Sequence, residues 1–181
     1  WKQEAARRGL LNLASTPEAL SYYDRPENVE LFGRLKIYTN EEVRARKDIL
    51  LENYCKVINI EALTMCEITL KQILPAALEF STRLADNVSK LSALGMTVGA
   101  QNEILLDVSK LINAAYAAEK KLEETQRAVK SETDLQTEAN LCHEKVFAAM
   151  QELREYCDRL ETLVPKELWP FPTYGDLLLY V

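Results

Sequence analysis

The sequence predicts an all-α protein whose body is an antiparallel bundle or coiled coil of long helices. The 181 residues include only five glycines and six prolines, and neither residue type occurs between Gly99 and Pro165. Long stretches without these breakers, rich in Ala, Leu, Glu and Lys, favour helices. Apolar residues also recur with alternating spacings of four and three, which is typical of helices packed side by side. We therefore expect about three-quarters helix, against about one-third in an average domain.

The first segment, residues 1–38, is predicted to be a string of short helices. Thr16 is expected to cap a helix that has Pro17 in its first turn, where Glu18 favours the positive end of the helix dipole. Pro26 is expected to open the next helix. The apolar residues of that helix should form one buried face: Val29, Leu31, Phe32 and Leu35.

The long-helix bundle is predicted over residues 39–165. Its three helices should cover about 39–95, 100–130 and 132–164. Thr39 and Glu42 have the spacing of a capping box, so they should mark the start of the first helix. Pro75 lies inside that helix, where it removes one backbone donor and crowds the preceding turn. We expect it to bend the helix near residues 71–74 without ending it, because apolar periodicity continues on both sides.

The second and third long helices carry the most regular apolar spacing, and this predicts the core. Their expected core residues are Ile104, Val108, Leu111, Leu122, Val146, Met150, Leu153 and Leu160. Such a seam is typical of an antiparallel pair that crosses at a shallow angle. Residues 131–134 are expected either to form a tight turn, with Ser131 as the cap of the last long helix, or to continue the helix. Pro165 should end the last long helix.

The last segment, residues 166–181, is an apolar and aromatic tail. Pro170 and Pro172 should hold it extended, and Thr173 should cap a final turn of helix. Because so apolar a tail is costly to leave in water, we expect it to dock. The candidate docking residues are Trp169, Phe171 and Tyr174. Docking within the chain and contact with another domain or subunit both remain open.

Charge and hydropathy limit the classes of partner. The formal net charge of −6 and the pI of about 5.0 give no general attraction for nucleic acid or anionic lipid. The basic residues Arg44, Arg46 and Lys47 stand among acidic ones, which is typical of a solvated helix face. No apolar run approaches the roughly 18 residues of a membrane span. We expect neither a nucleic-acid partner nor a membrane.

The motifs that bind phosphate or metal are absent from the sequence. There is no Gly-rich phosphate loop, no HExxH and no GxSxG, and His143 is the only histidine. Cys142 and His143 are adjacent, so on a helix they point about 100° apart and converge poorly on zinc. Asn140 stands where a di-iron ExxH motif needs glutamate. We therefore assign no catalytic, cofactor-binding or metal-binding residue within the chain.

The cysteines also favour a structural interpretation. None of the four forms a CxxC pair, so we expect four reduced, half-buried thiols in a cytoplasmic protein: Cys55, Cys66, Cys142 and Cys157. A nucleophilic Cys–His pair brought together by the fold remains an open alternative.

Several stretches resemble the C-terminal part of type III glutamine synthetases. They are EAARRGLLNL at 4–13, TPEAL at 16–20, NIEALTM at 59–65, ILPA at 73–76 and LWPFPTYGDLL at 168–178. They extend over nearly the whole chain, and the last is the most specific. The chain also lacks an initiator Met, so we expect it to be a piece of a longer protein.

The resemblance implies a parent glutamate–ammonia ligase, which makes glutamine with ATP and divalent Mg or Mn through a glutamyl-phosphate intermediate. The catalytic residues of that family lie upstream, and none of its catalytic motifs maps onto this sequence. The family assembles as a dodecamer of two stacked hexamers. The resemblance thus implies a non-catalytic structural or oligomerisation domain, whose partners are the upstream catalytic domain and neighbouring subunits. The alternative is a stand-alone helical adaptor or coiled-coil scaffold.

Overall fold

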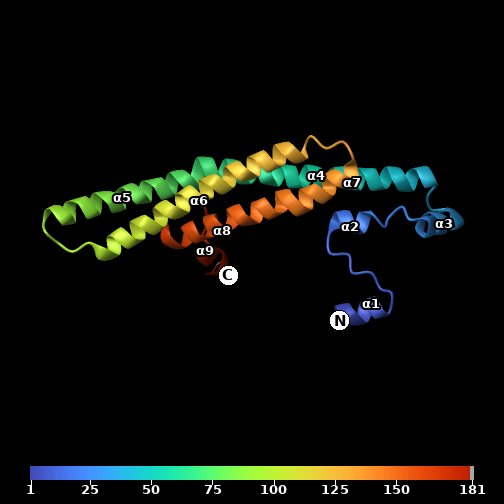
Figure 1. Cartoon of the computed structure of the whole chain (residues 1–181), viewed down its shortest axis with the longest axis horizontal. Helices are drawn as coiled ribbons and strands as arrows, with labels where there is room; N and C mark the ends of the chain where they lie inside the picture. Colours follow the sequence, from blue (N-terminus) through green and yellow to red (C-terminus); the bar gives the residue numbers. More distant parts are fainter. Residues whose placement is uncertain (180–181) are drawn as a thin grey trace. The chain divides into compact units, whose positions relative to one another are not determined.

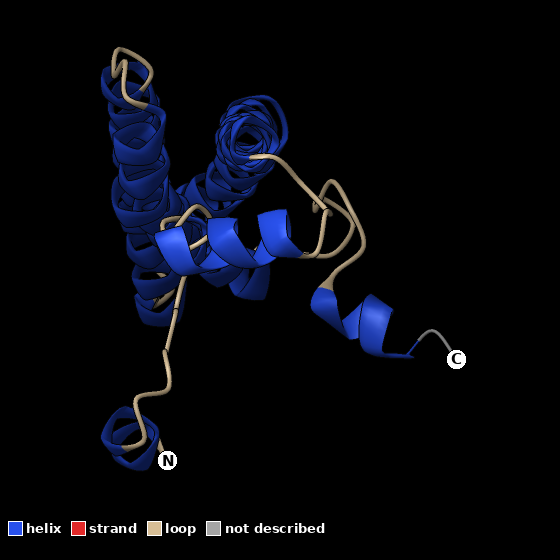
Figure 2. Ribbon diagram, turned by 90° about the vertical axis from the view of Figure 1, so that its right-hand side faces the viewer, coloured by secondary structure: helices blue, strands red, loops and turns tan. Residues whose placement is uncertain are grey.

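The computed structural model describes residues 1–179, and within them the chain is all-helical (Figure 2). Helices take up 78% of these positions and no strand is found among them, so the predicted all-α class and helix content are confirmed. The elements, labelled in Figure 1, are α1 (Lys2–Arg7), α2 (Thr16–Leu20), α3 (Pro26–Arg34), α4 (Asn40–Ile68), the π-helix η1 (Thr69–Ile73), α5 (Leu74–Ala93), α6 (Gly99–Val129), α7 (Leu135–Leu141), the π-helix η2 (Cys142–Val146), α8 (Phe147–Leu163) and α9 (Tyr174–Leu179).

The chain divides into two compact units. Unit 1 comprises Trp1–Ile60 and Gln126–Phe147, and unit 2 comprises Glu61–Thr125 and the residues from Ala148 onward. Of the predicted tail, Tyr180 and Val181 lie outside the described residues.

The short helices of unit 1 start close to the predicted positions but differ in detail. Ser15, not Thr16, is the N-cap of α2, since its extended backbone lets its hydroxyl accept a bond of 3.3 Å from Glu18 N. Helix α3 begins at Pro26 as expected. The prediction that its apolar face is buried was wrong, because α3 has no buried residue and Leu35 is 57% exposed.

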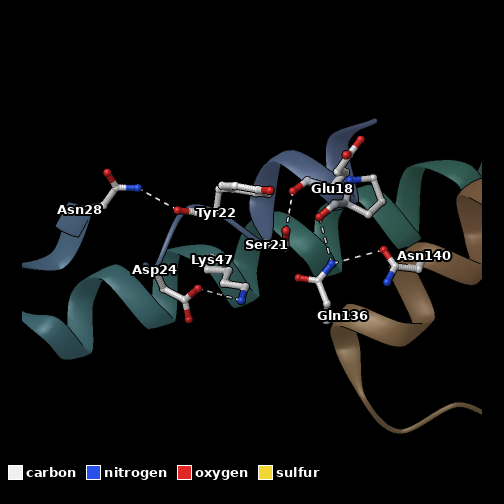
Figure 3. Close-up of polar contacts among 9 residues, drawn as sticks. Glu18, Ser21, Tyr22, Asp24, Asn28, Lys47, Gln136 and Asn140 are labelled. Atoms are coloured by element: carbon white, nitrogen blue, oxygen red, sulfur yellow. Dashed lines mark hydrogen bonds and ion pairs between the residues drawn. The ribbon is translucent and has the colours of Figure 1, made fainter. Parts of the chain in front are cut away.

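Polar contacts attach α2 to its neighbours in unit 1 (Figure 3). The side-chain amide of Gln136 on α7 donates a bond of 3.0 Å to Pro17 O. Lys47 on α4 forms an ion pair of 2.9 Å with Asp24, just after α2. Both partners of that pair are largely covered, so it is less screened than a surface pair.

Helix α4 begins with the predicted capping box. Thr39 Oγ1 accepts from Glu42 N at 3.2 Å, and Thr39 N donates to Glu42 Oε2 at 2.7 Å. The helical path then continues through η1 into α5, so Pro75 does not end it, as predicted. In η1 the Leu74 N–H donates to Thr69 O, five residues earlier, which widens the turn just before Pro75. That wider turn makes room for the proline ring, which clashes with the fourth preceding carbonyl in a regular helix.

The last long helix begins later than predicted and is capped by a different residue. Asp134, whose backbone is extended, accepts a bond of 2.9 Å from Thr137 N, so Ser131 does not cap α7. Helix α7 runs into η2 and then into α8, which ends at Leu163. In η2 the Phe147 N–H donates to Cys142 O, again five residues earlier.

Most of the predicted core residues are buried. Those with exposed fractions of 6% or less are Val108, Leu111, Leu122, Val146, Met150, Leu153 and Leu160. The expectation for Ile104 was wrong, because its exposed fraction is 40%. Ile104 lies near the start of α6, next to the connector at residues 94–98, where Leu94 and Met96 are also exposed. Few neighbours are available there to cover an apolar side chain.

Candidate docking site of the aromatic tail

The three candidate docking residues lie in unit 2 and differ in burial. Trp169 is 7% exposed, Phe171 is half-buried, and Tyr174 is 47% exposed. The Trp169 and Phe171 rings meet edge to face, with ring centroids 5.4 Å apart, a geometry that adds to the value of burying them. The tail thus makes contacts inside its own chain through Trp169, while Tyr174 keeps half of its surface open.

A cavity of about 280 Å³ lies where the tail meets the rest of unit 2. Ile73 at the end of η1, Cys157 and Glu161 on α8, and Trp169, Phe171 and Tyr174 of the tail are among its lining residues. Its wall is therefore mainly apolar, with carboxylates at one side. Trp169 Nε1 is buried and has no hydrogen-bond partner, so the indole contributes by packing rather than by hydrogen bonding.

Tyr174 is held by polar contacts with α8. Its hydroxyl accepts a bond of 2.8 Å from Arg154 Nη2 and donates one of 3.4 Å to Asp158 Oδ1. Its backbone N–H donates to Glu161 Oε1 at 2.7 Å. Hydrogen bonds with charged partners are stronger than neutral ones, so these contacts orient the start of α9.

The final turn has the predicted local cap. Thr173 N donates to Asp176 Oδ2 at 3.0 Å, and Asp176 N donates to Thr173 Oγ1 at 3.2 Å. Asp176 also forms an ion pair with Lys166. The pKa of Asp176 lies below its ordinary value, mainly because of the contact with Lys166 and to a smaller extent because of the hydrogen bonds with Thr173. Leu177 and the two residues after it remain largely exposed, so α9 presents an apolar edge to its surroundings.

The four cysteines are set apart by their burial. All four are free and buried rather than half-buried. Burial, followed by the effect of Cys142, raises the pKa of Cys55 to about 12, and burial also raises the pKa of Cys66 to about 11. His143 Nδ1 lies 3.4 Å from the Tyr54 hydroxyl. Because the thiolate is the nucleophile, raised pKa values disfavour the Cys–His alternative.

Among residues 1–179, no group of three or more His, Cys, Asp or Glu side chains is arranged to hold a metal ion. In the same range, no helix combines the length and the apolar character needed to cross a lipid bilayer.

One unusual residue escaped the sequence reasoning. Glu119 on α6 is only 1% exposed, and its Oε2 has no hydrogen-bond partner, although Lys120 Nζ lies 3.5 Å away. Glu119 also interacts with the buried thiol of Cys66. The sequence spacing does indicate that Glu119 is buried. It follows Ala115 by four residues and precedes Leu122 by three, which places it on the same core-facing side of the helix.

Comparison with known proteins decides the family. A family model described as the glutamine synthetase C-terminal domain matches residues 1–92, just over half of the chain. The chain belongs to the glutamine synthetase C-terminal domain family. The predicted resemblance is thereby confirmed, and the matched residues include α1 through most of α5.

Relatives of this glutamine synthetase domain extend the similarity over nearly all of the chain. Glutamine synthetase of Butyrivibrio fibrisolvens is 34% identical over 180 residues, which are 98% of this chain and 26% of the relative. Type-3 glutamine synthetase of Dictyostelium discoideum is 30% identical over 184 residues, and glutamine synthetase of Bacteroides fragilis is 28% identical over 185. In both cases these are 98% of this chain and 25% of the relative. The chain therefore spans about a quarter of the length of these relatives.

Proposed function

We propose that this chain is the non-catalytic C-terminal structural domain of a glutamine synthetase. The parent enzyme joins ammonia to glutamate with ATP, and this domain packs on the catalytic part and supports contacts between subunits. The observation that carries the proposal is the family match together with the length of the relatives. A glutamine synthetase C-terminal domain matches here, while three-quarters of each relative lies outside the matched region.

The side chains support a structural role. ATP and Mg or Mn would serve the parent enzyme, and among residues 1–179 no group of three or more His, Cys, Asp or Glu side chains is arranged to hold a metal ion. The carboxylates of these residues are largely engaged along helix surfaces, as in the pairs Glu52–Lys56 and Glu67–Lys71, with nearest distances of 2.9 and 2.7 Å. Such i,i+4 pairs are spread along a helix and do not converge on one ligand. No step of the reaction is therefore assigned to residues of this chain.

The proposed structural role depends on how the long helices and the aromatic tail pack. We infer that the long helices pack as an antiparallel bundle, supported by side chains of α5 and α6 that line a common cavity in unit 2, among them Leu78 and Leu105. Trp169, Phe171 and Tyr174 are proposed as an interface segment whose open side meets the catalytic part or a neighbouring subunit. Four free thiols support a cytoplasmic location, where cysteines stay reduced.

Deletion of the domain from the full-length gene product tests this function. The full-length protein and a form lacking the 181 residues would be compared for assembly mass by light scattering and for ATP-dependent glutamine formation. We expect the truncated form to lose the large homo-oligomer, which the family resemblance makes a dodecamer, and to lose activity as a consequence. Unchanged mass and unchanged activity would contradict the proposal and favour an independent adaptor.

A further inference from the structure

Helix α4 has a second apolar face besides the one that enters the core. In unit 1 its inner face consists of Val43, Leu51, Cys55 and Ile58, each no more than 7% exposed. A different set lies on the outside and is 43–64% exposed: Ile49, Leu50, Val57 and Ile60, here named the outer stripe. Ile49 and Leu50 are adjacent, Val57 follows Leu50 by seven residues, and Ile60 follows Val57 by three. These spacings place the four side chains within a sector of about 100° on one side of the helix, over about 17 Å.

The outer stripe is not an ordinary solvated surface. Three of its residues, Ile49, Val57 and Ile60, are β-branched, and such residues have lower helix propensity than the Ala, Glu or Lys expected on an exposed face. A polar border lies beside them, where Lys56 and Glu52 form an ion pair of 2.9 Å. Exposed Asn53 lies on the same side, four residues after Ile49 and four before Val57. Apolar side chains mixed with polar ones and flanked by charges are found at protein–protein interfaces. Ile49 and Ile60 point away from the inner face, and covering such apolar side chains with another surface is favourable.

We propose that the outer stripe of α4 is the surface by which this domain docks onto the rest of its own polypeptide. This inference rests on the proposed function, and it names the contact surface that the function needs. The covering segment is an apolar face of the part of the same chain that lies outside these 181 residues. Ile49 and Ile60, three helical turns apart, are its two anchor points.

Two observations favour that occupant over a second copy of this domain. The matched relatives are about four times as long as this chain, so a large further part of the same polypeptide is available. Its covalent attachment gives it a high effective concentration at the stripe. A second copy would instead bring the same net charge of −6 to the contact, which opposes self-association.

Cysteine accessibility in the full-length protein tests the surface. Ile60→Cys is introduced and labelled with a maleimide under native conditions, and the labelled peptide is quantified by mass spectrometry. Leu106→Cys is the matched control, since Leu106 on α6 is also apolar and is 58% exposed against 62% for Ile60. Rates in urea correct for intrinsic reactivity. We expect the Ile60→Cys site to react at least about tenfold more slowly than the control, because its covering must open locally first. Equal rates would overturn the proposal.

A second measurement identifies the occupant. Benzoylphenylalanine in place of Ile60 is activated by light in oligomers assembled from isotopically light and heavy chains. A cross-link within one chain to a peptide outside the 181 residues supports the proposal, and a cross-link between chains overturns it. If the Ile60→Cys protein does not fold, Ile49→Cys replaces it. If the outer stripe is accessible but deletion of the domain still breaks up the oligomer, the proposed docking surface is wrong. The proposed structural function is then retained.

Discussion

The side-chain amide of Gln126 on α6 donates two hydrogen bonds to Asn59 on α4, one of 2.9 Å to its backbone oxygen and one of 2.7 Å to Oδ1. Gln126 is 8% exposed, so this polar link lies among buried side chains in unit 1. It gives the Asn59 amide oxygen a hydrogen-bond partner, and it adds a second donor to a carbonyl that already lies within the hydrogen-bond ladder of α4.

Removal of this link should destabilise the chain. Gln126→Met keeps the side-chain length and leaves Asn59 Oδ1 without this donor, so the free energy of unfolding should fall by about 1–3 kcal/mol. Urea denaturation measures the effect, and Gln151→Met at an exposed position of α8 is the control. A Gln126→Met variant as stable as the control would show that water replaces the lost bonds at no cost.

Trp169→Ala should lower the free energy of unfolding by about 3 kcal/mol, because it empties a buried aromatic site. Trp1→Ala is the natural control, since Trp1 is 83% exposed and its loss should stay within about 0.5 kcal/mol. In a Trp1→Phe background, Trp169 emission should also be blue-shifted relative to water. An unchanged melting temperature with water-like emission would mean that the tail does not dock within this chain.

Glu119→Gln should raise the stability of the chain. The buried carboxylate of Glu119 lacks a hydrogen bond on one oxygen, and a neutral amide of the same shape removes the desolvation cost of the charge. Because the Lys120 side chain is 43% exposed and stays hydrated without its partner, we expect a gain of about 1 kcal/mol in urea denaturation. Glu124→Gln, at an exposed position of the same helix, should be neutral. A net loss of stability in Glu119→Gln would instead show that the pair with Lys120 is favourable.

The cap of α9 should weaken in acid. The pKa of Asp176 in the folded chain lies below its ordinary value of 3.8, first because of Lys166 and then because of Thr173. A depressed pKa means that the contribution of Asp176 is complete above 3.8 and is lost as the pH falls through the folded-state value. A carboxyl-detected NMR titration should give a midpoint below 3.8 for Asp176. A midpoint at or above 3.8 would rule out the Lys166 and Thr173 contacts in solution.

The purified 181-residue chain should neither bind ATP saturably nor form glutamine. Phosphoryl transfer needs a nucleotide cradle and bound metal to neutralise developing charge, and the net charge of −6 adds no attraction for an anionic nucleotide. Calorimetry and an ATP-dependent glutamine assay measure this, with the full-length protein as positive control. Stoichiometric micromolar binding that is removed by substitutions within this chain would reopen the search for a site here.

Features set by neighbouring residues could be predicted from the sequence. The Thr39–Glu42 and Thr173–Asp176 caps depend on side chains three residues apart, so spacing alone identifies them. Where two nearby residues can each cap a helix, the sequence does not distinguish them. Ser131 was the predicted cap, but Asp134 has the extended backbone that a cap requires. The π-helices were also missed, because sequence spacing does not distinguish a five-residue turn from a four-residue turn.

Features set by distant residues could not be predicted. Ile104 has the right spacing for a core residue, but its burial depends on how far neighbouring helices extend. For the tail, the aromatic composition indicated docking. The residues that hold Tyr174, namely Arg154, Asp158 and Glu161, lie 13–20 positions earlier and look like ordinary surface charges on α8.

The π-helix η1 has a consequence for anyone who shortens or recombines this chain. Each residue of an α-helix turns the following side chains by about 100° around the axis, so the extra residue held in a π turn sets the phase of everything after it. Deleting one residue from Thr69–Ile73 would let the turn relax to regular α-helical geometry. Forcing all the residues of this stretch into a regular α-helix would instead rotate Ala76 and Ala77, both buried on α5, away from the core. Alignments and chimaeras that treat this stretch as an ordinary helix would therefore place the wrong face of α5 inward.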